Sequence, residues 1–413
     1  MSLFELVSIL LSLAALFAYI NHRFIGLPNG IGIMLIGLLM SLFLVALNKL
    51  SWVATDQIEV IFAQVDFDET VMNGMLSFLL FAGALHVNIN RLASVKDTIA
   101  ILATMGVVMS SVIVSVVSFY IFQLFNIDIP YIYCLVFGVL ISPTDPIAVM
   151  GILKKVGAPK SIEVKITGES LFNDGIAVVL FIAVLGVATG ESEASFSGVG
   201  WLFLQEAIGG AVFGIALGYI GYLMLKSIDN YQVEILITLA MVAGGYALAQ
   251  QLHLSGPIAI VIAGLMIGNQ GRMLAMSDVT RGRLDNFWEL IDEVLNAVLF
   301  LLIGVEILLI HFLPNYIYSA LLIIPLVLVA RFISVGLPVT LLRFKNTYSP
   351  HVIKILTWGG LRGGISVALV LSLPDVPFRE PLIAATYAVV LFSILVQGLT
   401  VGKVAAMAKK DGT

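Results

Sequence analysis

Long apolar runs, repeated along nearly the whole chain, are the feature that most limits the folds open to this sequence. Of its 413 residues, 60% are hydrophobic and 11% are charged. A helix needs roughly 20 mostly apolar residues to cross a membrane, and within the lipid every backbone polar group must be paired inside the protein. We therefore predict an all-α polytopic membrane protein with about 13 transmembrane helices. Their centres fall near residues 11, 38, 80, 111, 140, 178, 212, 243, 262, 299, 328, 363 and 391.

Lysine and arginine are distributed unevenly between the loops on the two sides of this predicted bundle. With the N-terminus outside, seventeen of the 21 basic residues lie in cytoplasmic loops. Lys49 and Arg379 lie outside, and Arg331 and Arg362 lie within predicted helices. Because loops rich in lysine and arginine stay on the cytoplasmic side, this bias predicts an odd number of helices and a cytoplasmic C-terminus.

Several classes of protein are disfavoured by the composition. The single cysteine, Cys134, excludes an intrachain disulfide and a thiolate metal cluster, and the five histidines show no ligand spacing. The formal net charge is −5, and nothing in the sequence points to nucleic-acid binding. We expect membrane lipid as the surroundings, no nucleic-acid partner and no cofactor.

Two of the predicted helices carry helix breakers and a charge at their centres. The fifth contains Ser142–Pro146, with two prolines around an aspartate, and the twelfth contains Trp358–Gly364, with four glycines around an arginine. Proline removes a backbone donor and glycine weakens helical preference, so both helices should unwind. They lie seven helices apart and therefore run in opposite directions. We predict inverted repeats whose unwound helices 5 and 12 cross and frame an ion site. Simple kinks or close packing are the alternative.

The segment Gly168–Gly175 brings two carboxylates into an otherwise apolar helix. On a helix Glu169 and Asn173 share one face, and Ser170 and Asp174 share the adjacent face. Charges at this depth are costly and typically mark an ion or proton path. Because burial disfavours a bare carboxylate, we expect Asp174 to hold either a proton or a cation. Such competition is sufficient for exchange if the protein moves the site from one face of the membrane to the other only while the carboxylate holds a proton or a cation. A capping or turn role is the alternative for Asp174.

Oxygen ligands for an alkali cation are expected from the unwound part of the fifth helix. Thr144 offers a hydroxyl and a freed carbonyl, Asp145 a carboxylate, and Ser170 a further hydroxyl. With Asp174 these residues form the predicted cation and proton site. Alternatively, Asp145 only complements the positive ends of the two half-helices.

Glu169 needs a cationic partner to remain charged at this depth. Arg331, in the middle of the eleventh helix, is the better candidate because an unpaired guanidinium there is very costly. Arg362 either neutralises the C-terminal ends of half-helices, pairs with Asp145, or is an ordinary arginine near a loop. Asn173 is expected to position its neighbours by hydrogen bonds without adding charge.

These motifs together resemble those of the NhaP-like sodium/proton antiporters of the monovalent cation:proton antiporter-1 (CPA1) family, over essentially the whole chain. The resemblance rests on Ser142–Pro146, Gly168–Gly175, Arg331 and Gly359–Gly363. It implies a single transmembrane transporter domain over residues 1–413, with core helices at about 98–190 and 315–405. The remaining helices would form a dimerisation scaffold, and the protein would be a homodimer in a bacterial or archaeal cell membrane.

The resemblance also assigns roles within the site. It places the ion-binding aspartate on Asp174 and makes Glu169 a neighbour of the ion, acting through water or through Arg331. Family members with asparagine followed by aspartate here are electroneutral, so Asn173 implies exchange of one proton for one sodium. The residues implied around Na⁺ are Asp174, Asp145, Thr144 (carbonyl) and Ser170.

We predict a secondary active antiporter that exchanges Na⁺, with Li⁺ or K⁺ as further candidates, for H⁺ and contributes to pH homeostasis. A potassium/proton antiporter and, less favoured, a cation channel with a continuous pore are the alternatives. No enzyme is expected. An intramembrane aspartyl protease using Asp145 and Asp174 would need Gly-x-Gly-Asp or Tyr-Asp settings, which the sequence lacks. Asp292 and Glu293, near the cytoplasmic end of the tenth helix, either attract cations or form a solvated face.

Overall fold

The computed structural model describes residues 3–49, 70–190, 196–307, 313–344, 348 and 351–410. Within these ranges the chain is helical apart from turns, connecting segments and one isolated antiparallel bridge between Asp145 and Leu361. The all-α class is therefore confirmed.

Nine helical stretches in the described ranges are long and apolar enough to cross a membrane. Two shorter apolar helical stretches, Thr70–Leu85 and Tyr131–Leu140, accompany them. The second is short because it ends at the predicted break in the fifth helix. The total of about 13 membrane-crossing helices remains a prediction.

The first half of the chain runs from the N-terminus to the long helix that carries Asp174. Three of its helical stretches contain π-helical turns, labelled η. The elements in order are α1 (Leu3–Ile20), η1 (Asn21–Ile25), α2 (Asn29–Lys49), η2 (Thr70–Met75), α5 (Leu76–Leu85), α6 (Ile89–Ser94), α7 (Lys96–Ile101), η3 (Leu102–Gly106), α8 (Val107–Leu124), α9 (Tyr131–Leu140), α10 (Ile147–Val156) and α11 (Lys160–Thr189).

The second half continues with three helices that the sequence starts with side-chain caps. Asn230, Ser255 and Ser277 each accept a hydrogen bond from the first turn of the helix that follows. The elements are α12 (Phe196–Lys226), α13 (Tyr231–Gln251), α14 (Gly256–Met266), η4 (Ile267–Gly271), α15 (Arg272–Leu274), α16 (Asp278–Glu306), α17 (Pro314–Leu342), α18 (Val352–Trp358), α19 (Gly364–Leu371), α20 (Arg379–Phe392), η6 (Ser393–Gly398) and α21 (Leu399–Lys410).

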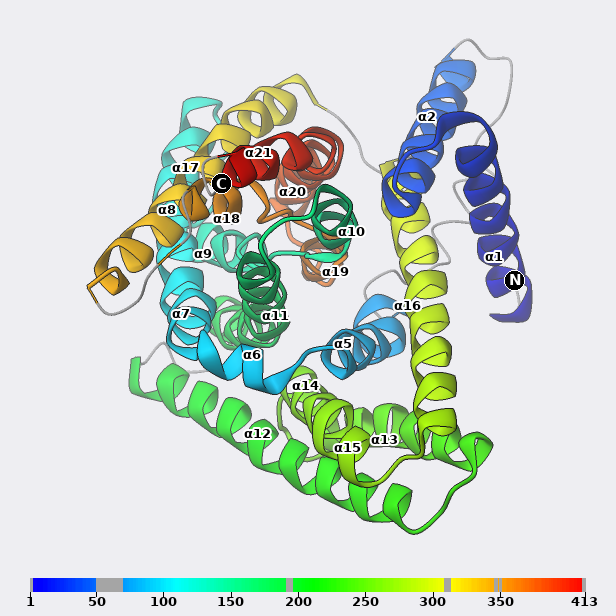
Figure 1. The fold of residues 1–413 in the computed structure, drawn as a ribbon. Helices are drawn as coiled ribbons and strands as arrows, with labels where there is room; N and C mark the ends of the chain where they lie inside the picture. The colour runs from blue at the N-terminus through cyan, green and yellow to red at the C-terminus, as the bar shows by residue number, and fades with distance from the viewer. Residues whose placement is uncertain are drawn as a thin grey trace.

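The helices form two groups in space. Figure 1 shows α7–α11 together with α17–α21, so segments from the two halves of the chain intermix. Helices α12–α15 lie along another side, with α16 rising from them towards α1 and α2. Helix α14 packs between α12 and α5, and α16 packs along α2.

The two predicted breaks are present and meet. Helix α9 stops at Leu140 and α10 starts at Ile147, while α18 stops at Trp358 and α19 starts at Gly364. Between these half-helices the backbone N–H of Asp145 donates to the carbonyl of Leu361 at 2.8 Å. The unwound segments therefore cross in an antiparallel sense, as an inverted repeat requires.

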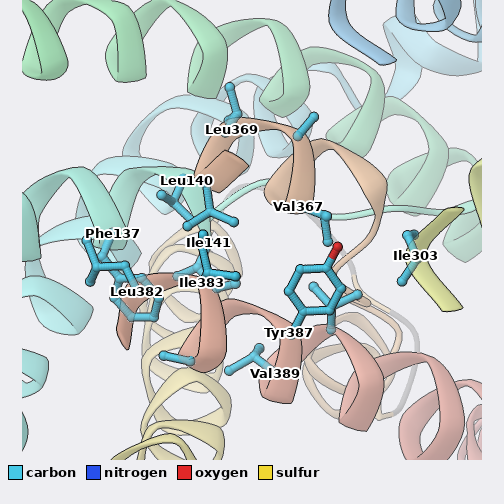
Figure 2. Packing of buried hydrophobic residues seen from close by; sticks show 14 of the residues in the cluster. Phe137, Leu140, Ile141, Ile303, Val367, Leu369, Leu382, Ile383, Tyr387 and Val389 are labelled. Carbon is cyan, nitrogen blue, oxygen red and sulfur yellow. The ribbon is translucent and has the colours of Figure 1, made fainter. Parts of the chain in front are cut away.

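Apolar packing fixes the half-helices around this crossing. Figure 2 shows the end of α9 packed against α20, with α19 above them and Ile303 of α16 beside Val367 and Tyr387. All of the labelled side chains are buried, and none lines the large cavity described below. This tight contact limits the freedom of α9, α19 and α20. The labelled residues are Phe137, Leu140, Ile141, Ile303, Val367, Leu369, Leu382, Ile383, Tyr387 and Val389.

Candidate ion-binding site

Helix α11 supplies four polar side chains to the interior. Glu169, Ser170 and Asn173 are 1%, 2% and 1% exposed, and Asp174 is 7% exposed. The helix continues unbroken for 30 residues, so none of the four is a cap at a helix end. The alternative role of Asp174 as a capping residue is thereby wrong.

Thr144 connects the unwound segment to α11. Its hydroxyl lies 3.0 Å from the hydroxyl of Ser170 and accepts a hydrogen bond of 2.9 Å from the side-chain amide of Asn173. The backbone N–H of Thr144 in turn donates to the side-chain oxygen of Asn173 at 3.4 Å. Asn173 therefore contacts Thr144 through both ends of its amide, which is the positioning contact expected of it.

Asp145 is held at the crossing by backbone contacts. Its N–H bonds to Leu361, and one carboxylate oxygen accepts the N–H of Ile147 at 2.8 Å, at the start of α10. A carboxylate at this position complements the positive end of α10. A Cβ atom at Gly363 would lie only 2.8 Å from Cγ of Asp145, so glycine allows the two segments to approach.

Glu169 and Arg331 form the predicted ion pair. The guanidinium donates two hydrogen bonds to the two carboxylate oxygens, at 2.5 Å and 2.9 Å, and a third to the carbonyl of Leu356 at 3.2 Å. Both side chains are buried. The pair links α11 to α17 and, through Leu356, to α18. Gly360 passes beside the guanidinium, since a Cβ atom there would lie 3.0 Å from Cζ of Arg331.

Arg362 caps the end of the first half-helix. Its guanidinium donates to the carbonyls of Ser142 and Pro143, the latter at 2.8 Å, just beyond the C-terminus of α9. Carbonyl groups at a helix C-terminus carry partial negative charge, which a cation stabilises. The first of the three roles considered for Arg362 is therefore the one present.

The two arginines line one small cavity. It has a volume of about 10 Å³, which is space for about one water molecule. Three polar atoms of its lining residues make no hydrogen bond within the described chain: Nε of Arg331, Nη2 of Arg362 and the hydroxyl of Thr357. The Glu169 pair and the cap on α9 are thus neighbours.

A second, much larger cavity of about 760 Å³ reaches the candidate ligands. Thr144, Asp145 and Asp174 line it, whereas Ser170, Glu169 and Asn173 do not. Asp145 and Asp174 are close enough for their charges to repel each other. The cavity wall also carries charged residues of both signs. These charged residues are Arg91, Lys154, Glu163, Glu289, Asp292 and Glu293.

Two buried polar residues in this wall were not predicted. Asn296 of α16 and Ser366 of α19 line the cavity, and each has a side-chain oxygen without a hydrogen bond among the described residues. The sequence contains a signal for Asn296, because it follows Asp292 by four residues and so shares a helix face with that acid. Ser366 is an ordinary small residue in its sequence context and gave none.

Similarity to known proteins covers almost the whole chain. A family model described as sodium/hydrogen exchanger, transmembrane, matches residues 11–406. The Na⁺/H⁺ antiporter NhaP of Pseudomonas aeruginosa is 50% identical over 403 residues, covering 96% of this chain and 95% of that protein. The Na⁺/H⁺ antiporter NhaH of Halobacillus dabanensis is 37% identical over 380 residues, covering 90% of each.

A solved structure has the same fold. The sodium proton antiporter MjNhaP1 of Methanocaldococcus jannaschii at pH 8 superimposes with a TM-score of 0.78, covering 98% of this chain and 99% of that one. The identity is 22%, so this match supports the fold.

Proposed function

Since the chain belongs to the sodium/hydrogen exchanger family, a family of membrane transporters, we propose that it exchanges Na⁺ for H⁺ across a cell membrane. The observation that carries this proposal is the position of Asp174. It is a carboxylate, 7% exposed, that faces a cavity from an apolar helix. Within the described chain it forms no ion pair or hydrogen bond, and its charged neighbour Asp145 repels it. A bare carboxylate in this setting is costly, so either a proton or a cation must occupy it.

The transported Na⁺ would bind between the unwound segment and α11. Asp174 and Asp145 supply charge, Thr144 supplies its carbonyl, and Ser170 supplies its hydroxyl, which already lies against that of Thr144. Oxygen donors of this kind suit a hard alkali cation. The proton and the ion compete for the same carboxylates, so binding one releases the other.

Glu169, Arg331 and Arg362 do not line the large cavity, and they support this site from behind it. The bidentate pair fixes α11 against α17, and Arg362 fixes the end of α9. Asn173 contributes no charge and orients Thr144. With asparagine rather than aspartate at this place, we assign an exchange of one Na⁺ for one H⁺, which moves no net charge.

Transport would proceed by movement of a core past a scaffold. The core comprises residues of about 98–190 and 315–405, and the scaffold comprises the remaining helices and forms a homodimer. The large cavity supports this division, because the unwound segment Pro143–Pro146, α10, α11 and α19 of the proposed core line it together with α2, α5, α6 and α16 of the proposed scaffold. The same cavity includes Arg91 and Lys154, which the excess of basic residues assigns to the cytoplasmic side. The described conformation would therefore face inward, with the N-terminus outside and the C-terminus in the cytoplasm.

Purified protein in liposomes that contain a pH-sensitive dye would test the function. An inward Na⁺ gradient should drive protons out of the vesicles, and collapsing the membrane potential with an ionophore should not alter the rate if exchange is one for one. Li⁺ and K⁺ gradients, applied separately, define the ion preference. Proton movement that follows the membrane potential without coupling to Na⁺ would indicate a channel and contradict the proposal.

Asp174→Asn is the decisive variant for the site. The change keeps the side-chain size and removes the exchangeable group, so the protein should unfold at a temperature close to that of the wild type and transport nothing. Asp278→Asn is the matched control, because Asp278 is an acid at the start of α16 that does not line the cavity. Transport by Asp174→Asn at the wild-type rate would refute the assignment.

A further inference from the structure

Helix α16 presents its own polar pair to the cavity. Asp292 and Asn296 are four residues apart, so they share a face of the helix, and both line the cavity. The amide of Asn296 bonds to the carboxylate of Asp292, and Asp292 lies within electrostatic range of Asp145. The pair is thus on the scaffold side of the cavity, near the candidate transport site.

The oxygen of Asn296 is the unusual atom in this arrangement. Asn296 is 6% exposed, and its Oδ1 has no hydrogen-bond donor among the described residues. Because the amide nitrogen already bonds to Asp292, the free group is an acceptor only. A buried carbonyl oxygen without a donor costs stability, and such an oxygen suits a cation.

A hydroxyl on α19 is the second unpaired oxygen considered in this cavity. Ser366 is 1% exposed, lines the same cavity, and has an Oγ without a partner in the described chain. Helix α19 lies directly against α16 here, because a Cβ atom at Gly364 would lie 2.8 Å from Cγ of Leu299. Leu299 is one turn from Asn296, and Gly364 is two residues from Ser366.

We propose that Asp292, Oδ1 of Asn296 and Oγ of Ser366 form a second site for a monovalent cation, which loads the ion before it reaches Asp145 and Asp174. One carboxylate with two neutral oxygens matches one positive charge, and all three donors are hard. A cation there also shields Asp145 from the charge of Asp292. The proposal rests on the proposed function, since it concerns the path of the transported ion.

Kinetics of variants in liposomes test this site. Asp292→Asn should raise the apparent KM for Na⁺ about tenfold, and Asn296→Ala and Ser366→Ala about threefold each, with kcat within about twofold of the wild type. Glu289→Gln is the matched control, because Glu289 is an exposed acid on the same helix and cavity wall. Its KM should stay within about twofold of the wild type. Equal KM shifts in Asp292→Asn and Glu289→Gln would mean that Asp292 acts only by general electrostatic attraction. That result would overturn the second site.

Direct binding of radioactive Na⁺ to purified protein separates this proposal from the function itself. Asp174→Asn should still bind Na⁺, and Asp174→Asn/Asp292→Asn should bind none. Binding by the double variant equal to that of Asp174→Asn overturns the second site, whatever the transport results. Absence of Na⁺-driven proton movement in the wild-type protein would instead refute the proposed function, and normal transport by Asp174→Asn would refute the assignment of Asp174. Thermal unfolding confirms that each variant is folded. If Ser366→Ala misfolds, Ser366→Cys replaces it, because cysteine keeps the side-chain size and puts a soft sulfur in place of the hard oxygen.

Discussion

At the scale of single residues, the buried ion pair between Glu169 and Arg331 is expected to be important for stability. Both side chains are buried, and the guanidinium uses its two terminal nitrogens on the carboxylate. Removing one partner of such a pair leaves an uncompensated charge in a medium that solvates it poorly. Loss of one partner should therefore destabilise the protein more than replacement of both by apolar residues.

Glu169→Ala should lower the free energy of unfolding by about 3 kcal/mol or more, because Arg331 is left as an orphan. Denaturant unfolding of the purified protein in detergent measures this difference. Glu169→Ala/Arg331→Met removes both charges and should recover at least half of the loss. If Glu169→Ala unfolds like the wild type, the pair does not stabilise the fold.

At the scale of elements, the crossing of the two broken helices depends on contacts that side chains would obstruct. The backbone bond from Asp145 to Leu361 joins the unwound segments, and Gly363 passes against the side chain of Asp145. Each half-helix keeps its own hydrogen bonds, so the crossing is the point at which α9, α10, α18 and α19 are held together.

Gly363→Ala should disturb this crossing. The added methyl overlaps the Asp145 side chain, so we expect a loss of about 1–3 kcal/mol in the free energy of unfolding and a clear loss of transport. Gly336→Ala in α17 is the control, because its Cβ would meet no atom closer than 3.7 Å. That variant should be as stable as the wild type or slightly more so. Equal behaviour of the two variants would mean that the crossing tolerates a side chain.

At the scale of the whole molecule, one large cavity is lined both by charged residues of α6, α10, α11 and α16 and by the candidate ligands Asp145 and Asp174. Asp145 and Asp174 both line this cavity, so on the proposed function protons and sodium ions that enter it would reach the same two groups. Such sharing has a kinetic consequence that a separate regulatory proton site would not have.

Lowering the pH at the cavity side should raise the apparent KM for Na⁺, by up to about tenfold for each pH unit in the acidic part of the activity profile. The sign follows from competition, because protons occupy the carboxylates that Na⁺ needs. The maximal rate at saturating Na⁺ should stay nearly constant over the same range. Transport measured in liposomes against Na⁺ at several pH values checks this. A falling maximal rate at constant KM would place the controlling proton elsewhere.

Much of this architecture could be predicted because it depends on local properties of the chain. Apolar runs of membrane-spanning length predicted the helices, and prolines and glycines around Asp145 and Arg362 predicted both breaks. The cost of burying charge at Glu169 predicted that Arg331 would be its partner. Each argument needs only the residue and its near neighbours in sequence, together with the low polarity of a membrane.

Other features were decided by the tertiary structure alone. The sequence left open whether Arg362 pairs with Asp145 or caps α9, and the cap is what forms, because the crossing places the carbonyls of Ser142 and Pro143 beside the guanidinium. It gave no reason to place Ser366 and Asn296 in the wall of one cavity, because they lie on helices far apart in the chain. Such contacts depend on how each helix is rotated and displaced against its neighbours. A helical period determines which residues share a face, but packing between elements determines what that face meets.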